Sequence, residues 1–140
     1  MPTQNHFFAQ LGLPGLFHGY HGIVMGVSAG SMNAAHIVYA APEEPGEAAD
    51  PHYSRWMNGL GLTETRILPH YQFIRDHLLD GQKVEDIALA DSKKRHFLAL
   101  PDGSYILCAD GSEALYGKGW YFADGMMEEI NEDEDVLPLR

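Results

Sequence analysis

The sequence predicts an α/β domain, and three observations carry that prediction. A short apolar segment at residues 23–27 ends at a glycine-flanked turn, as a buried parallel strand does. A segment that suits a helix follows it at residues 29–41. Several short apolar segments, separated by turn residues, then fill the second half of the chain. Their close spacing is typical of antiparallel strands joined by tight turns.

Two helical segments are expected before the predicted strand. Residues 2–13 carry an apolar stripe that includes Phe7 and Leu11, and Asn5 can cap this helix. A Pro-Gly turn separates it from a second helical piece at residues 16–20. The chain is therefore expected to begin with two helices, which the strand, the sharp turn and the next helix follow.

The rest of the chain begins with a loop. Residues 42–58 are rich in proline, glycine and acidic side chains. Cys108 lies in an apolar segment and is expected to be buried in a strand. The further elements expected are a strand at 66–68, helices at 73–79 and 84–89, strands at 96–100, 105–109, 114–116 and 120–122, and a solvated acidic tail at 128–135.

The composition limits the function. Nine Lys and Arg stand against twenty Asp and Glu, a formal net charge of −11. This charge argues against nucleic acids and anionic membrane surfaces as partners.

A single cysteine forms no internal disulfide, so a reducing cytoplasm is the simplest location. No cofactor is expected, and no metal either, because His18 and His21 lack a third ligand. The length suggests one domain over residues 1–140.

Residues 26–30 match the pattern G-x-S-x-G, with Ser28 at the centre. A predicted strand before the serine and a predicted helix after it form the setting of a nucleophile elbow. In such a turn the serine has a strained backbone, and the N–H of the next residue, Ala29, can donate to an oxyanion. A glycine-flanked helix cap, with Ser28 as the N-cap residue, is the alternative.

A nucleophilic serine needs a base, and His70 is the best placed of the eight histidines. It follows a short apolar strand and a proline, so it is expected at the carboxyl end of a strand, where open α/β sheets form their sites. Asp102 follows the strand predicted at 96–100 and is the candidate carboxylate that orients His70. A plain turn aspartate before Gly103 is the other interpretation.

Taken together, these segments resemble the dipeptidase E and cyanophycinase family of serine peptidases. Residues 26–34 are similar to its nucleophile segment, and residues 59–62 with 67–71 to its histidine segment. Residues 98–104 are similar to the segment that carries the third, acidic residue, and residues 114–130 to the terminal strands. The resemblance implies a class I glutamine amidotransferase-like (flavodoxin-like) parallel sheet, here partial, with antiparallel strands at its C-terminal end.

The resemblance also implies the chemistry. Ser28 would be the nucleophile, His70 the general base and acid, and Asp102 the residue that orients His70, with the Ala29 N–H in the oxyanion hole. Glu43, in the loop after the nucleophile helix, ranks behind Asp102 as the acid. Small peptides are the expected substrates.

Two departures from the family qualify this expectation. The family has parallel strands and a Gly-Gly turn before its nucleophile strand, and residues 2–5 resemble the segment just after that turn. The chain is therefore expected to be the C-terminal portion of a peptidase E-like domain, completed by a missing N-terminal segment or by a homodimer. Residues 80–83 also do not match the family's arginine-bearing motif, which argues against a preference for aspartyl peptides.

Two functions therefore stay open on the sequence. The first is a hydrolase of small peptides, weak or inactive at this length. The second is a non-catalytic domain that dimerises or binds a partner through an exposed sheet edge. A glutamine amidotransferase is disfavoured because its nucleophile would be cysteine, and position 28 is serine.

Overall fold

A four-stranded mixed sheet forms the centre of the fold in a computed structural model that describes residues 1–131 and 136–139. Its strand order is β10–β9–β6–β3. Strands β3 (Ile67–Leu68) and β6 (Phe97–Ala99) run parallel, with Ile67 opposite Leu98. Strands β9 (Gly119–Ala123) and β10 (Met126–Ile130) extend the sheet with antiparallel pairing. The prediction of an α/β domain with parallel strands and later antiparallel strands is thus confirmed.

The connection from β3 to β6 is a crossover, as parallel pairing requires. It contains the short helix α4 (Tyr71–Ile74), a hairpin of β4 (Leu78–Leu79) and β5 (Gln82–Lys83), and the helix α5 (Val84–Ser92). Helix α5 buries one face against β9 and β10. The crossover therefore returns the chain to the same edge, so that both strands end on one side of the sheet.

A three-stranded antiparallel sheet follows β6. It consists of β7 (Tyr105–Ala109), β8 (Ser112–Tyr116) and β11 (Val136–Pro138), with β8 in the middle. The turn after β6 thus leads into a different sheet and does not close a hairpin on β6. Leu98, Leu100 and Leu115 form a small buried cluster between the two sheets.

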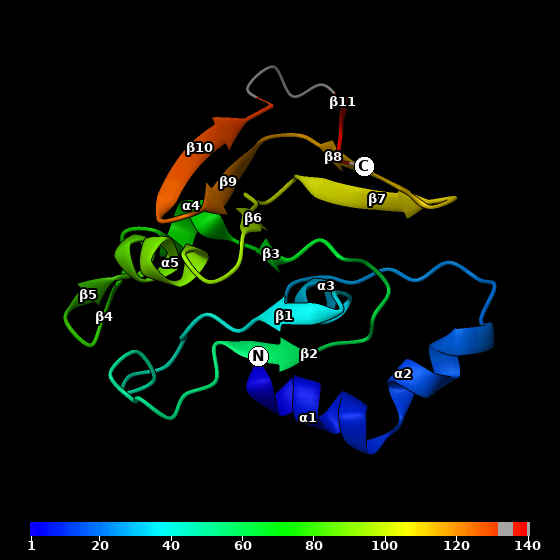
Figure 1. The fold of residues 1–140 in the computed structure, drawn as a ribbon, viewed down its shortest axis with the longest axis horizontal. Helices are drawn as coiled ribbons and strands as arrows, with labels where there is room; N and C mark the ends of the chain where they lie inside the picture. Colours follow the sequence, from blue (N-terminus) through cyan, green and yellow to red (C-terminus); the bar gives the residue numbers. More distant parts are fainter. Residues whose placement is uncertain (132–135, 140) are drawn as a thin grey trace.

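The N-terminal half contributes three helical pieces and a small hairpin. The helices are α1 (Pro2–Gln10), α2 (Leu13–Leu16) and α3 (Ala29–Asn33), with a 3₁₀ turn, η1 (Phe17–Gly19), after α2. Strands β1 (Ile37–Tyr39) and β2 (Trp56–Asn58) pair antiparallel as a separate sheet. Figure 1 shows α1 and α2 beneath this hairpin, with the larger sheets on its other side.

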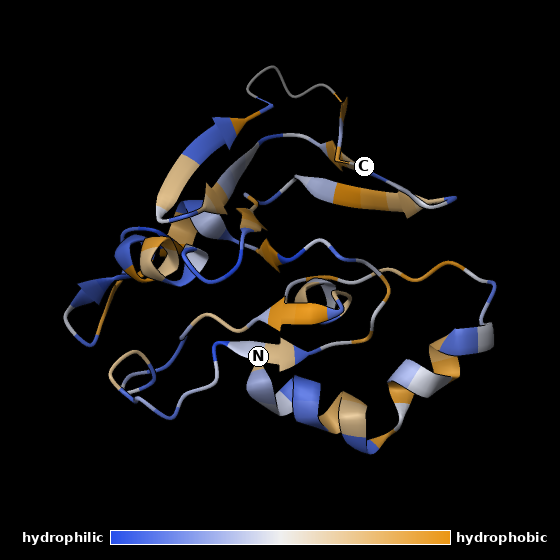
Figure 2. Ribbon diagram, viewed as in Figure 1, coloured by the Kyte–Doolittle hydropathy of each residue, from blue (hydrophilic) through white to orange (hydrophobic). Residues whose placement is uncertain are grey.

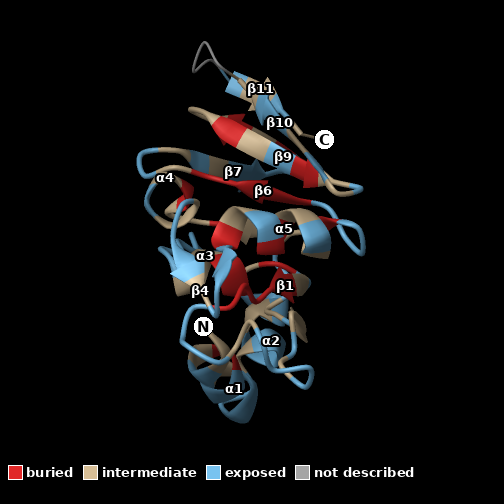
Figure 3. Cartoon of the chain, turned by 90° about the vertical axis from the view of Figure 1, so that its left-hand side faces the viewer, coloured by how far each residue is buried: buried red, intermediate tan, exposed pale blue. Residues whose placement is uncertain are grey.

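The main core joins the hairpin to the central sheet through stacked aromatic rings. Tyr39 of β1 stacks on Phe97 of β6 with ring centroids 4.3 Å apart, and Phe97 stacks on Phe122 of β9 at 5.0 Å. Such pairs add to the stabilisation from their buried area. Figure 3 shows burial concentrated in β1, β6 and β9, whereas α1 and α2 are largely exposed. Helices α1 and α2 therefore add little to the core.

The segment at residues 23–27 is not the buried strand that its composition predicts. It pairs with no strand in the described part of the chain, and Ile23 and Met25 are 94% and 85% exposed. Figure 2 shows it as an apolar stretch of coil that leads into α3. A β-strand needs neighbours for its backbone N–H and C=O groups, and within residues 1–131 and 136–139 nothing supplies them here.

The helix predicted over residues 29–41 ends at Asn33. Its second half instead contains β1, in which Val38 lies opposite Met57 of β2. The β-branched pair Ile37 and Val38 favours a strand, and tertiary pairing decides the outcome. The loop predicted at residues 42–58 correspondingly ends in β2.

Four smaller predictions also need correction. Asn5 does not cap α1: Met1 is the N-cap residue, and the side chain of Asn5 is buried. The helix expected at 73–79 is confined to α4, and residues 78–79 form β4. Cys108 lies in the predicted strand but is exposed. Residues 128–130 of the expected acidic tail belong to β10, and residues 132–135 lie outside the described part.

Candidate active site

Ser28 occupies a strained turn directly before α3. Its backbone angles, φ 52° and ψ −123°, lie outside the regions that side chains allow without strain. Its carbonyl accepts hydrogen bonds from the N–H groups of Ser31 and Met32, at 3.0 and 3.1 Å, and from the Ser31 hydroxyl at 2.6 Å. The Ser28 side chain makes no capping bond to α3. Ser28 is therefore the N-cap residue of α3 by position, but its side chain does not cap the helix, and its hydroxyl is left for another partner.

Gly26 explains part of the glycine pattern around this serine. A Cβ atom at position 26 would lie 2.7 Å from the Ser31 nitrogen and 2.8 Å from the Gly30 carbonyl oxygen, so only glycine fits. A Cβ atom at position 30 would meet nothing within 4 Å. The close approach of the incoming chain to α3 therefore requires the first glycine of the pattern only.

His70 and Asp102 come from the ends of the two parallel strands. His70 follows β3 and is the N-cap residue of α4, with φ 60°. Asp102 follows β6, and its backbone N–H donates to Oε1 of Gln72 in α4 at 3.1 Å. The N–H of Tyr71 donates to the carbonyl of Leu100 at 3.1 Å. These two bonds hold the start of α4 against the end of β6.

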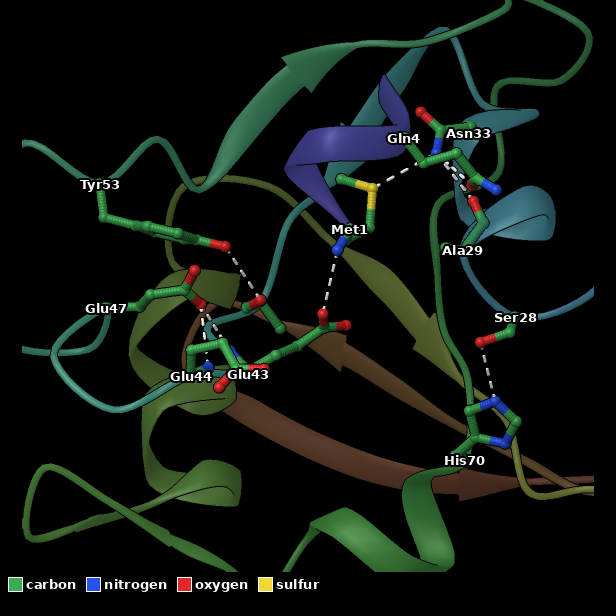
Figure 4. A network of polar contacts seen from close by, with 11 residues as sticks. Met1, Gln4, Ser28, Ala29, Asn33, Glu43, Glu44, Glu47, Tyr53 and His70 are labelled. Atoms are coloured by element: carbon green, nitrogen blue, oxygen red, sulfur yellow. Dashed lines mark hydrogen bonds and ion pairs between the residues drawn. The ribbon is translucent and has the colours of Figure 1, made fainter. Parts of the chain in front are cut away.

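The structure brings the three predicted site residues together. His70 Nε2 lies 3.0 Å from Ser28 Oγ, a contact that Figure 4 shows, and His70 Nδ1 lies 2.6 Å from Asp102 Oδ1. A carboxylate at Nδ1 fixes the tautomer with the proton on that nitrogen, so Nε2 can accept the Ser28 proton. The His70 and Asp102 side chains are 42% and 53% exposed, so the site is open to solvent.

Ala29 is the first residue of α3. The first N–H groups of a helix have no intrahelical acceptor and carry partial positive charge, as an oxyanion donor must. Helix α3 is itself fixed by two buried amides. Asn5 Nδ2 of α1 donates to Asn33 Oδ1 at 2.8 Å, and Asn33 Nδ2 donates to the Ala29 carbonyl at 2.8 Å. These bonds fix both the first and the last residue of α3, and with them the turn that carries Ser28.

A cavity of about 340 Å³ opens beside Ser28 and His70. Its other lining residues are mostly apolar: Met32, Ala41, Pro42, Glu43, Pro45, Leu68, Pro69, Ile74, His77, Leu78, Leu79 and Val84. Among the described residues that line it, Glu43 is the single carboxylate, and none is Lys or Arg. Space next to a serine and histidine in contact is where a substrate side chain could lie.

Glu43, the alternative acid, contacts a different partner. Its Oε2 accepts from the Met1 α-ammonium at 3.1 Å (Figure 4). Asp102, in contrast, contacts His70. The loop that carries Glu43 is fixed by Asp80, whose carboxylate accepts the N–H groups of Gly46 at 2.7 Å and Ala49 at 3.0 Å. These bonds, with that to Gly46 the stronger cause, lower the pKa of Asp80.

The sequence analysis did not identify Gln72 or the cavity-facing position of Glu43. Gln72 carries no signal of its own, because its role depends on the distant backbone of Asp102. Within residues 1–131 and 136–139, no three His, Cys, Asp or Glu side chains are grouped so that they could hold a metal. None of the helices in those ranges combines the length and apolarity needed to cross a membrane.

Most of the chain matches the model of a known protein family. Residues 20–115 match the model of peptidase family S51, a match that covers more than half of the chain and includes Ser28, His70 and Asp102. No curated protein and no solved structure shows significant similarity to the chain. The family match extends from the exposed apolar segment before Ser28 into β8. The chain therefore belongs to peptidase family S51.

Proposed function

We propose that the protein is a serine peptidase in which Ser28 is the nucleophile, His70 the general base and acid, and Asp102 the residue that orients His70. The observation that carries the proposal is the 3.0 Å contact between Ser28 Oγ and His70 Nε2, at a serine with φ 52°. A strained serine beside an oriented imidazole is the arrangement that activates a hydroxyl. Family S51 supports peptidase chemistry in general.

The reaction would proceed through an acyl-enzyme. Ser28 Oγ attacks the peptide carbonyl carbon while its proton moves to His70 Nε2, and the Ala29 N–H donates to the oxyanion. The tetrahedral intermediate then expels the amine, which takes the proton from Nε2. Water attacks the ester, again giving its proton to His70, and the released Ser28 hydroxyl recovers it. Asp102 accepts from Nδ1–H throughout and stabilises the imidazolium.

Small peptides with a neutral side chain suit the cavity best. Its wall is mainly apolar, and no described lining residue is Lys or Arg, so an acidic side chain would find no cationic partner there. An aspartyl preference like that of dipeptidase E proper is therefore not proposed. Within family S51 we place the chain with the dipeptidase E and cyanophycinase type and its class I glutamine amidotransferase-like fold, on the likeness of its three motif segments.

We further propose that residues 23–27 become a strand when neighbouring strands flank them. The segment is apolar and exposed, and it lies directly before the nucleophile. Exposed strand-forming segments favour pairing with another polypeptide. Of the two sources considered, a segment with family-like parallel strands accounts for the chemistry better than a second copy, because it could also supply an oxyanion donor.

A fluorophosphonate probe tests the proposed nucleophile. The probe should label the folded chain at Ser28, because only an activated serine attacks its phosphorus at a measurable rate. Peptide mass spectrometry locates the adduct, and a Ser112→Ala variant serves as the matched control, since Ser112 is an exposed serine of the β7–β8 hairpin. An unlabelled chain, or equal labelling after Ser28→Ala, would favour the non-catalytic alternative.

Replacing Asp102 with asparagine should lower kcat by about 10- to 100-fold and leave KM nearly unchanged. The amide no longer favours the proton on Nδ1. Because the Asp102 side chain is 53% exposed, water can partly replace the carboxylate. The loss in kcat is therefore smaller than the about 10⁴-fold loss found for a buried aspartate in this role. Steady-state kinetics with an aminoacyl p-nitroanilide measures this. Asp110→Asn, in an exposed turn, is the control, and equal kcat values for both variants would remove Asp102 from the mechanism.

A further inference from the structure

The serine and the histidine of the site come from two separately hydrogen-bonded units. Ser28 precedes α3, which leads into the β1–β2 hairpin, whereas His70 follows β3 of the central sheet. Within residues 1–131 and 136–139 no ladder joins these two sheets, and an isolated bridge pairs Ala35 with Thr63 of the segment before β3. The 3.0 Å contact between Ser28 Oγ and His70 Nε2 therefore depends on how that segment is held.

Residues 59–63 are bonded to the end of α3 and to the residues that follow it. The N–H of Leu60 donates to the carbonyl of Asn33, the last residue of α3, at 2.7 Å. The N–H of His36 donates to the carbonyl of Thr63 at 2.8 Å. In Figure 1 the chain passes beside α3 on its way from β2 to β3. Thr63 is therefore the point at which the unit that carries the serine meets the segment that leads to the histidine.

A buried carboxylate from a third sheet binds this point. Glu113 lies in β8, the middle strand of the three-stranded sheet, and its side chain is buried. Its Oε1 accepts the Thr63 hydroxyl at 2.6 Å, and its Oε2 accepts the Thr65 hydroxyl. The Thr63 oxygen in turn accepts the backbone N–H of Thr65 at 3.0 Å. Hydrogen bonds to a carboxylate are stronger than those between neutral groups, so Glu113 can fix the position of Thr63.

Strand β8 is itself packed on the unit that carries the histidine. Its Leu115 is fully buried in a cluster with Leu100, which follows β6. The carbonyl of Leu100 accepts the N–H of Tyr71, the residue after His70, at 3.1 Å. Through β8, Glu113 therefore ties the segment at Thr63 to the part of the central sheet from which the imidazole projects.

We propose that Glu113 is a positioning residue, which holds Ser28 within reach of His70 by binding Thr63. This inference rests on the proposed peptidase function, because it concerns the same serine–histidine contact. Glu113 touches neither the substrate nor the reacting atoms. Its loss should loosen the contact between Ser28 and His70 and leave the bond from His70 to Asp102 in place, since the paired strands β3 and β6 carry both partners of that bond.

A thiol at position 28 tests this geometry without turnover. In a Cys108→Ser chain, Ser28→Cys puts a sulfur beside His70, and a neighbouring imidazolium lowers a thiol pKa below its ordinary value of about 8.5. The pH dependence of alkylation by iodoacetamide measures that pKa. Glu113→Ala and Thr63→Val should each raise it by about one unit, toward the value in the His70→Ala chain.

Two further variants show whether the effect passes through Thr63. Thr63→Ser keeps the hydroxyl that Glu113 binds, so the thiol pKa should stay low. Combining Glu113→Ala with Thr63→Val should raise the pKa no more than either change alone, because both remove the same bond. Ser92→Ala is the matched control, since it removes another buried hydroxyl, which donates to the Leu89 carbonyl and accepts the Gly125 N–H. It should leave the thiol pKa unchanged.

Three results would overturn the role of Glu113. The first is a thiol pKa that stays low in a folded Thr63→Val or Glu113→Ala chain. The second is an equal rise in Ser92→Ala, which would mean a general loosening of the fold. The third is an ordinary thiol pKa in the chain that keeps both Glu113 and Thr63, because no contact would then exist to be positioned. Failure of the peptidase function would be seen separately, as a Ser28 that no fluorophosphonate labels in the otherwise unchanged chain.

Discussion

Replacing Ser28 with alanine should lower kcat/KM for an aminoacyl p-nitroanilide by about 10³-fold or more. His70→Ala should cost about as much, because an unactivated serine hydroxyl is a weak nucleophile. The double variant should be no slower than either single variant. When two groups act as a unit, removing the first already removes the effect of the second. The comparison is made by steady-state kinetics at one pH, with the folded state of each variant checked by circular dichroism.

His52→Ala is the matched control, because His52 is an exposed histidine of the loop between β1 and β2. Its kcat/KM should equal that of the parent chain. Additive losses in the double variant would show that Ser28 and His70 act independently, contrary to the contact of 3.0 Å between them. An unchanged rate in Ser28→Ala would mean that another residue is the nucleophile.

Supplying strand neighbours to residues 23–27 should raise kcat/KM by about 10²- to 10³-fold, the usual effect of one oxyanion donor. The Ala29 N–H is the one donor that we propose from this chain. A family-like segment with parallel strands and a Gly-Gly turn, fused before Met1, would add a second donor and bury the apolar side chains that are now exposed. The same peptide substrates measure both proteins.

A flexible Gly/Ser extension of equal length is the control for this fusion. Both extensions remove the Met1 ammonium from Glu43, so any effect of that removal on kcat/KM is the same in both. Only the strand-bearing extension should raise kcat/KM further. Hydrogen exchange should also slow at residues 23–27 in the fusion, because a paired strand protects its N–H groups. Equal rates for the two extended chains would mean that the isolated arrangement is already complete.

The positions of His70 and Asp102 could be predicted because they depend on local patterns and one topological rule. Each follows a short apolar segment and a proline, and parallel strands end at one edge of a sheet. The turn at Ser28 was predictable for a similar reason, since the glycine at position 26 indicates a close approach of the chain that leaves no room for a Cβ atom. These features lie within a few residues of the site.

Other features depend on partners far away in the sequence, and there the prediction was wrong. Residues 23–27 have the composition of a buried strand, but a strand exists only with its neighbours. The helix expected after Ser28 is shortened because Val38 pairs with β2, almost twenty residues further on. The contacts of Glu43 with Met1 and of Gln72 with Asp102 likewise join distant segments that no local pattern links.

The two contacts of His70 differ in mechanical character. Its bond to Asp102 joins the ends of the adjacent strands β3 and β6. These strands are paired by backbone hydrogen bonds, and the Gln72 side chain adds a further bond to the backbone of Asp102. Its contact with Ser28 spans two separately hydrogen-bonded sheets, because α3 leads into the β1–β2 hairpin and the central sheet carries the histidine. The first distance is therefore the stiffer one, since the Ser28 side is joined to the segment before β3 by an isolated bridge, Ala35 with Thr63, and not by a ladder between the two sheets. On warming, the serine would drift from the imidazole while the imidazole kept its carboxylate.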